Sequence, residues 1–189
     1  TVNTTPDGEW VLGPLKSVEC QKSFTPQSKY NENKRLAYYI NNLPRLHALY
    51  DNEVKSHAIC RIYCQFGIAF FRARRYDLAE PLLEQISGWR DYKNRPPETL
   101  THATSMYMLA MARQIKGDSV TALRLAKETL AFIDANPKTE FPAYEVINIF
   151  SGGSGYLGNK NLKMQINELI QHIRESPDKP ITNPYGYQK

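Results

Sequence analysis

Residues 60–86 read CRIYCQFGIAFFRARRYDLAEPLLEQI, and this stretch decides the fold. Apolar residues recur around and within it at spacings of three and four, which is typical of one face of a helix. The first set is Ile59, Ile62, Tyr63, Phe66 and Phe70, and the second is Leu78, Leu82, Leu83 and Ile86. A break at residues 74–76 separates the sets, and Asp77 is expected to cap the second helix. The spacing therefore predicts two antiparallel amphipathic helices over residues 55–87.

A second pair of helices is expected between about Glu98 and Ala135. The apolar positions are Leu100, Ala103, Met106, Leu109 and Ala110 in the first helix, and Val120, Leu123, Ala126, Leu130 and Ile133 in the second. Residues 116–118 (Lys-Gly-Asp) form the expected turn, because Gly suits the end of one helix and Asp the cap of the next. Asn136 and Pro137 end the pattern.

The first hairpin resembles a tetratricopeptide repeat (TPR), a motif of stacked helical hairpins. The residues that carry the resemblance are Phe66, Gly67, Phe70, Arg74, Tyr76 and Ala79. Leu109, Ala110, Gly117 and Ala122 repeat part of it 43 residues later, against about 34 in an uninterrupted array. The surplus falls in the polar loop 88–98, and Arg113 stands where Phe70 stands in the first hairpin, a position where the family usually has an aromatic residue. The resemblance covers about residues 56–136. It implies an all-α fold of antiparallel hairpins stacked as a short TPR-like solenoid.

The N-terminal part of the chain gives weaker signals. Residues 1–30 are rich in Thr, Pro, Ser, Asn and Gly, and we favour an extended arm packed on the first helix over a hairpin. Residues 31–53 have helical periodicity, interrupted before Pro44. A proline suits the first turn of a helix, so this segment is either one kinked helix or a degenerate helical hairpin.

The C-terminal part contains one clear helix. Residues 141–150 are ambiguous between helix and strand, with context favouring a helix, and residues 151–159 are a Gly-rich loop. An amphipathic helix is expected around Leu162, Ile166, Leu169, Ile170 and Ile173. The last segment has three prolines and no period, which predicts an extended or disordered tail. The expected organisation is therefore an arm at 1–30, a helical domain at 31–175 and a flexible tail at 176–189.

Charge and cysteine content bear on partners and compartment. The net charge is +5, and residues 16–75 hold eleven Lys or Arg against four Asp or Glu. A basic half could meet an acidic peptide, an anionic polymer or nucleic acid. The start at Thr1, the Thr/Pro-rich beginning and a disulfide from Cys20 to Cys60 or Cys64 would suit an exported or periplasmic protein, which we favour over a cytoplasmic one. No apolar run approaches the ~20 residues of a membrane-spanning helix.

No catalytic constellation is evident, so we expect neither an enzyme nor a cofactor. Residues 153–160 (GSGYLGNK) have two glycines of a phosphate-binding loop but lack the Lys that should follow the second. His57, Cys60 and Cys64 share a helix face, and Cys20 could add a fourth zinc ligand. Structural zinc sites use short knuckles instead of three ligands along one helix, so we expect no metal.

The TPR resemblance implies a concave groove that holds a partner. The residues expected to line it are Arg61, Cys64, Ile68, Phe71, Arg72, Thr104, Tyr107, Met111 and Gln114. Phe71 and Tyr107 would be apolar anchors, while Arg61 and Arg72 would pair with carboxylates of a peptide. Whether the apolar members are an open groove or a core covered by the arm or the first helix is left open by the sequence. We expect a non-enzymatic scaffold or adaptor for a protein or peptide partner. The alternative is a basic surface that binds nucleic acid or another anionic polymer.

Overall fold

The computed structural model describes residues 2–4, 10–12, 29–52, 57–87, 99–137, 162–184 and 186 of the chain. Its elements are β1 (Val2–Thr4), β2 (Trp10–Leu12), α2 (Lys29–Asn52), α3 (His57–Arg72), α4 (Tyr76–Ser87), α5 (Thr99–Ile115), α6 (Ser119–Asp134) and α8 (Leu162–Glu175). The expected all-α class is confirmed for these residues. The predictions for residues 88–98, 141–150 and 151–159 lie outside them. No helix in the described ranges is long and apolar enough to cross a bilayer.

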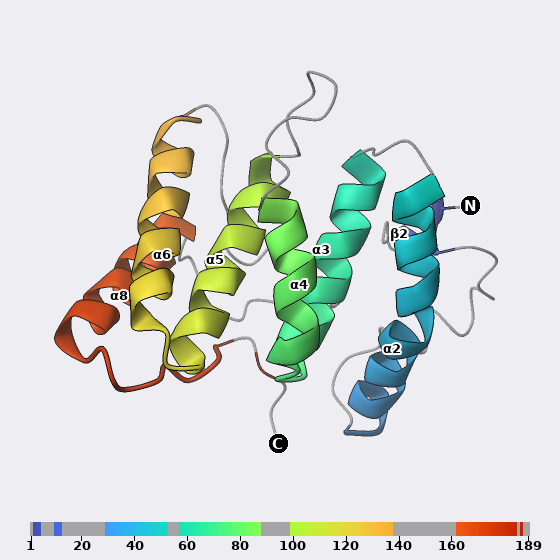
Figure 1. Cartoon of the computed structure of the whole chain (residues 1–189), viewed down its shortest axis with the longest axis horizontal. Helices are drawn as coiled ribbons and strands as arrows, with labels where there is room; N and C mark the ends of the chain where they lie inside the picture. The colour runs from blue at the N-terminus through green and yellow to red at the C-terminus, as the bar shows by residue number, and fades with distance from the viewer. Residues whose placement is uncertain are drawn as a thin grey trace.

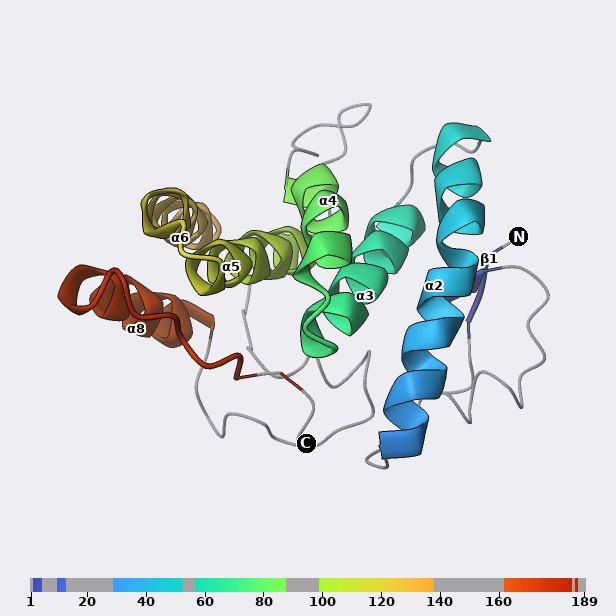
Figure 2. The ribbon, with the colours of Figure 1, turned by 60° about the horizontal axis from the view of Figure 1, so that its bottom comes forward.

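The six helices in the described part of the chain stand side by side in chain order, from α2 at one end to α8 at the other (Figure 1). Each helix from α2 to α6 packs on the next, α3 also packs on α5, and α8 covers α6 and the flank of α5. Figure 2 shows the same row from below, with α8 beside α5 and α6. The described side chains of the predicted hairpin stripes are therefore buried or half-buried between neighbouring helices, which is how amphipathic helices remove apolar surface from water. The exception is Val120 at the start of α6, which is 84% exposed.

Gly67 sets the distance between α3 and α4. A Cβ atom at this position would lie 2.7 Å from Cδ2 of Leu83, a side chain that is fully buried on α4. Ala79 on the same face of α4 is also fully buried. The two helices therefore approach closely because one of them has no side chain at the contact.

The two hairpin turns have the same hydrogen bonds, displaced by 43 residues. In the first turn the N–H of Arg74 donates to the carbonyl of Phe71 at 3.0 Å, and the N–H of Arg75 donates to that of Phe70 at 2.8 Å. In the second turn the N–H groups of residues 117 and 118 donate to the carbonyls of residues 114 and 113, at 3.0 and 2.9 Å. This pair of bonds is the Schellman motif, which requires left-handed backbone at the residue after the helix.

Two local predictions are wrong. Asp77 does not cap α4, because the helix begins at Tyr76 and the carbonyl of Arg75 already accepts from the N–H of Leu78. The Asp77 carboxylate instead pairs with the Arg75 guanidinium at 3.0 Å, and this hydrogen bond holds the pKa of Asp77 below its ordinary value. The preference for an arm over a hairpin near the N-terminus is also wrong. β1 and β2 form an antiparallel pair with Asn3 opposite Val11, because β-branched residues on both segments and the aromatic Trp10 on β2 favour pairing.

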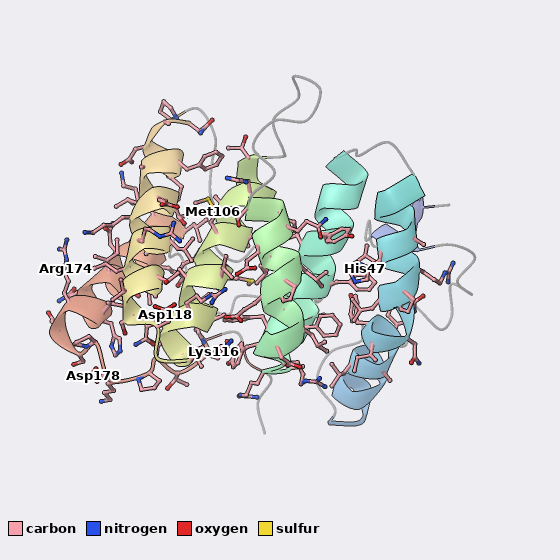
Figure 3. All side chains as sticks on the ribbon, in the orientation of Figure 1. His47, Met106, Lys116, Asp118, Arg174 and Asp178 are labelled. Atoms are coloured by element: carbon pink, nitrogen blue, oxygen red, sulfur yellow. The ribbon has the colours of Figure 1, made fainter. Side chains whose placement is uncertain are left out.

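The first helix is longer and simpler than the sequence suggested. α2 runs without a break from Lys29 to Asn52 and contains Pro44, so one helix replaces the alternative of a helical hairpin. It meets α3 through aromatic rings: the centroid of Tyr39 lies 4.7 Å from that of Phe66, in an edge-to-face arrangement. His47 on α2 points toward α3 (Figure 3), with its ring centroid 6.4 Å from that of Tyr63. β2 packs against α2 and α3 at this end of the row.

Candidate functional site

The residues predicted to line a groove are covered in this structure. They are Arg61, Cys64, Ile68, Phe71 and Arg72 on α3, and Thr104, Tyr107, Met111 and Gln114 on α5. The side chain of Arg61 lies outside the described part, and the other eight are buried, with exposed fractions of 5% or less. α3 and α5 do pack together, so the structure brings the two halves of the set side by side. The anchors Phe71 and Tyr107 are therefore core residues here, as in the second of the two alternatives. The described contacts that cover them come from residue 183 and from α8, and not from the arm or the first helix.

The segment that follows α8 crosses the ends of four helices. Figures 1 and 2 show it running from α8 back toward the α3–α4 turn. Residues 180–183 have no helix or strand of their own. Their contacts come instead from the C-terminal ends of α3 and α5 and the start of α4. Residues far apart in the sequence thus meet here, with separations of up to 112 positions.

Gln114, at the end of α5, holds this segment by its backbone. The side-chain Nε2 donates to the carbonyl of Lys179 at 2.9 Å, and Oε1 accepts from the N–H of Ile181 at 2.7 Å. In extended backbone, the carbonyl of one residue and the N–H of the residue two positions later point to the same side. In a parallel β-sheet, one residue of a strand bonds to this pair of groups on the neighbouring strand. Gln114 is 1% exposed, so its side chain is shielded from water although the two bonds are only partly buried. The side-chain amide of Gln114 thus makes the two bonds that a residue of a neighbouring strand would make, and it fixes the direction in which residues 179–181 run.

Asn183 makes the next contact along the segment. Its Nδ2 donates to the carbonyl of Phe71 at 2.9 Å and to the hydroxyl of Tyr76 at 3.0 Å. The ring of Tyr76 lies edge-to-face on that of Phe71, with centroids 5.4 Å apart, which fixes the hydroxyl in place. Phe71 and Gln114 occupy equivalent positions 43 residues apart. The segment therefore contacts the same position of both hairpins.

Three further contacts extend the site in both directions. The hydroxyl of Ser119 donates to the carbonyl of Pro177, and His172 Nε2 lies 2.6 Å from the carbonyl of Lys179. At the other end, a Cβ atom on Gly186 would lie 2.8 Å from the Arg74 guanidinium, so the arginine lies directly over the glycine. Asp178 is at the same end of the helix row as Lys116 and Asp118 (Figure 3). We call the site formed by Phe71, Tyr76, Gln114, Ser119 and His172 the tail site.

The rest of the predicted groove is occupied by contacts between helices. The hydroxyl of Ser105 on α5 lies 3.4 Å from Sγ of Cys64 on α3. Cys64 is a buried thiol that forms no disulfide, so the Cys20–Cys64 bridge considered from the sequence is absent. Burial, reinforced by the carboxylate of Glu168 on α8, raises the pKa of Tyr107 far above its ordinary value. The phenol is therefore neutral at physiological pH and offers no charge to a ligand.

A second concavity lies between α4, α5 and α6 and shares no residue with the tail site. Its volume is about 340 Å³, and it is lined by Glu84, Ser87, Met106, Leu109, Arg113, Thr121, Arg124, Leu125 and Glu128. Its charged side chains are already paired: Arg113 with Glu84, and Arg124 with Glu128 at 2.8 Å. Such internally neutralised pairs leave no net charge to attract an ion. The tail site is therefore the better candidate.

Sequence reasoning found only part of the tail site. Gln114 and Phe71 were among the predicted groove residues, but Tyr76, Ser119, His172 and the segment that they hold were not. The missing signal lay in the tail itself, where Ile181 and Asn183 stand among prolines. An apolar residue in a polar segment without periodicity indicates a docked strand as well as a disordered tail.

Comparisons of the chain with protein-family models, with curated proteins and with solved structures found no match. Within the described residues, no group of three or more His, Cys, Asp or Glu side chains is arranged to hold a metal ion.

Proposed function

We propose that this chain is a non-enzymatic TPR-like scaffold that binds an extended segment of a partner protein along the ends of α3 and α5. The observation that carries the proposal is the double bond of Gln114 to the backbone of residues 179 and 181. A side chain that reads both a carbonyl and an N–H group recognises an extended peptide largely independently of its sequence. Residues around it then supply selectivity.

The TPR-like, solenoid part of the proposal is supported by internal repetition. Both hairpins close with the same pair of hydrogen bonds at an offset of 43 residues. In the first hairpin, the absence of a side chain at Gly67 lets α3 pack closely on α4. Repeated hairpins that pack in chain order present equivalent positions along one side of the array. Phe71 and Gln114 are such a pair, and both contact the same peptide segment.

The alternative of a basic surface for nucleic acid gains no support from the described residues. Stacking on bases requires aromatic side chains that are open to solvent. Tyr63, Phe70 and Phe71 are fully buried, and Arg72 is 3% exposed. Arg75 is paired with Asp77. The basic and aromatic residues that suggested this alternative thus mostly serve the contacts between helices.

The test is capture of the partner from native extract at low and high salt, followed by titration of the purified partner against the purified chain. We expect a protein whose binding survives high salt and weakens about tenfold or more with Gln114→Leu, because two partly buried hydrogen bonds are lost. Gln171→Leu is the matched control, because Gln171 is exposed on α8 and bonds only to Glu175. Phe71→Ala and Arg72→Ala are unsuitable, since truncating either buried side chain would leave a cavity in the core, whereas Gln114→Leu keeps a side chain of similar volume.

Two results would contradict the proposal. The first is recovery of nucleic acid at low salt alone, which would favour the basic-surface alternative because phosphate contacts are strongly salt-dependent. The second is a protein partner whose affinity is the same for Gln114→Leu and Gln171→Leu, which would place the interaction elsewhere on the molecule.

A further inference from the structure

The tail site already contains a ligand, and that ligand belongs to the chain itself. Residues 179–186 read KPITNPYG. The contacts to this segment come from side chains of the helical domain that reach its backbone, and from the amide of Asn183 that reaches back. Side-chain bonds to an extended backbone are the means by which proteins hold peptides supplied by partners.

The geometry defines which residues an occupant needs. Pro180 lies between the two backbone groups that Gln114 holds, and proline suits this position because it has no N–H to leave unpaired and favours extended backbone. Ile181 follows, and its half-buried side chain packs against the core cluster. The first three positions therefore specify a carbonyl, a proline and an apolar residue.

Asn183 adds a polar requirement. Its amide donates two hydrogen bonds, one to the Phe71 carbonyl and one to the Tyr76 hydroxyl. A carboxylate has no N–H to donate and would face the carbonyl oxygen of Phe71 directly, so aspartate cannot replace asparagine. Three residues later, a Cβ atom at position 186 would lie 2.8 Å from the guanidinium of Arg74, an exposed and flexible side chain that can move aside. The site thus distinguishes asparagine from aspartate and tolerates residues other than glycine at the end of the segment.

We propose that residues 179–186 are a self-ligand of the tail site, and that the partner binds by presenting an extended segment with the same pattern and displacing them. The pattern is Pro, an apolar residue, any residue and Asn. This inference rests on the proposed function and names both the partner's chemistry and the event that opens the site.

The tether makes the self-ligand a strong competitor. Only residues 176–178 separate α8 from the segment, and Ser119 holds Pro177 in place. A short tether presents its ligand at an effective concentration on the order of millimolar. A free peptide with the same sequence must therefore bind the intact chain roughly 10- to 100-fold more weakly than a chain whose own tail has been loosened.

The experiment uses the full-length chain and a fluorescent peptide of residues 177–189, followed by fluorescence anisotropy. The loosened variant carries Ile181→Ala and Asn183→Ala, and the matched control carries Lys179→Ala and Thr182→Ala, two side chains that are exposed. We expect binding to the loosened variant at least tenfold tighter than to the natural chain and to the control. Adding Gln114→Leu to the loosened variant should abolish binding, and a peptide with Asn183→Asp should bind at least tenfold more weakly.

Asn183→Asp in the full chain is the second variant, in case the double substitution perturbs folding, because it changes the side-chain volume very little. It should open the site to the natural peptide as well. Equal peptide binding by the natural chain and both opened variants would overturn the inference, as would no binding to an opened variant whose circular dichroism is native. Dimers of the natural chain that are lost with Asn183→Asp would overturn it in favour of a second copy as the occupant.

The outcome is separable from that of the proposed function. A partner that binds the natural and the loosened chain equally, but is lost with Gln114→Leu, leaves the scaffold function standing and removes the self-ligand. If the peptide binds as expected but neither the natural nor the loosened chain retains a protein partner, the self-ligand stands and the scaffold function is removed.

Discussion

Arg74 and Gly117 occupy equivalent positions in the two hairpin turns, and both have left-handed backbone, with φ of 60° and 91°. The hydrogen bonds around them are the same, so the turn geometry is set by the hairpin and not by the residue. For a residue with a Cβ atom, left-handed backbone costs roughly 1–2 kcal/mol relative to the right-handed region. Gly117 has no Cβ atom and so avoids this conformational cost, whereas the backbone of Arg74 is strained by it. Arg74 is thus the residue that keeps a side chain over Gly186 at the expense of a strained turn.

Substitution of each turn residue by alanine should therefore have different effects. Gly117→Ala should lower the free energy of unfolding by about 1 kcal/mol, because nothing lies within 4 Å of the new Cβ atom and only the backbone is strained. Arg74→Ala exchanges one L-residue for another at the same φ, so it should change the free energy of unfolding by less than about 0.5 kcal/mol. Urea unfolding of both variants measures the difference. Equal losses at the two positions would show that φ does not control these turns.

The contact between Gly67 and Leu83 predicts a size limit on α3. Gly67→Val should lower the free energy of unfolding by about 1–3 kcal/mol, because new methyl groups would overlap a fully buried leucine. The measurement is chemical unfolding of the purified variant.

A double-mutant cycle provides the control. Leu83→Ala alone should cost about 2–5 kcal/mol by leaving a cavity. In the double variant the valine fills part of that cavity. The decrease in its free energy of unfolding should therefore be smaller than the sum of the decreases in the two single variants by about 1 kcal/mol or more. Additive losses would mean that the two residues do not limit each other.

The helical hairpins could be predicted because their information is local. The spacing of apolar residues predicted α3 to α6 and α8. The Lys-Gly-Asp sequence predicted a helix end at Gly117, which has left-handed backbone, and a helix cap at Asp118. The first turn misled the prediction, because Arg74 adopts a conformation that its residue type does not favour. The helix start consequently lay one residue before Asp77.

The candidate site could be predicted only in part, because its two sides are far apart in the sequence. Helix periodicity identified Phe71 and Gln114 as residues on one side of the hairpins. It could not show that Ile181 and Asn183 would cover them, since contacts across 67 and 112 positions leave no periodic trace. The same limit applies to burial: Tyr107 and Met111 have the residue types of either a core or a groove, and only the packing of α8 and its neighbours distinguishes the two.

Glu80 is predicted to link the two hairpins through charge. It is 7% exposed on α4, and its carboxylate lies 3.4 Å from Nε of Arg113 and 2.7 Å from Nζ of Lys116, both at the end of α5. Glu80→Gln should lower the free energy of unfolding by about 1–3 kcal/mol, because two cations lose a shielded partner. Glu84→Gln is the control. It removes a half-exposed partner of Arg113 and should cost less than about 1 kcal/mol, a loss that 0.5 M NaCl reduces. A larger loss at Glu84 than at Glu80 would contradict this assignment.

Asp118 makes stability depend on pH at the start of α6. Its carboxylate accepts from the N–H of Thr121 at 3.0 Å. The hydrogen bond with the Thr121 side chain and this capping bond lower the pKa of Asp118 below its ordinary value. A carboxyl with a lowered pKa in the folded state contributes stability above its unfolded pKa, near 4, and loses it as the pH falls through the folded value. Asp118→Ala should therefore cost about 1 kcal/mol at pH 7 and progressively less below pH 4. Asp178→Ala, at an exposed position in the tail, should leave the pH profile unchanged. Urea unfolding from pH 7 to pH 2.5 measures both, and a cost of Asp118→Ala that does not change with pH would rule out the charged cap.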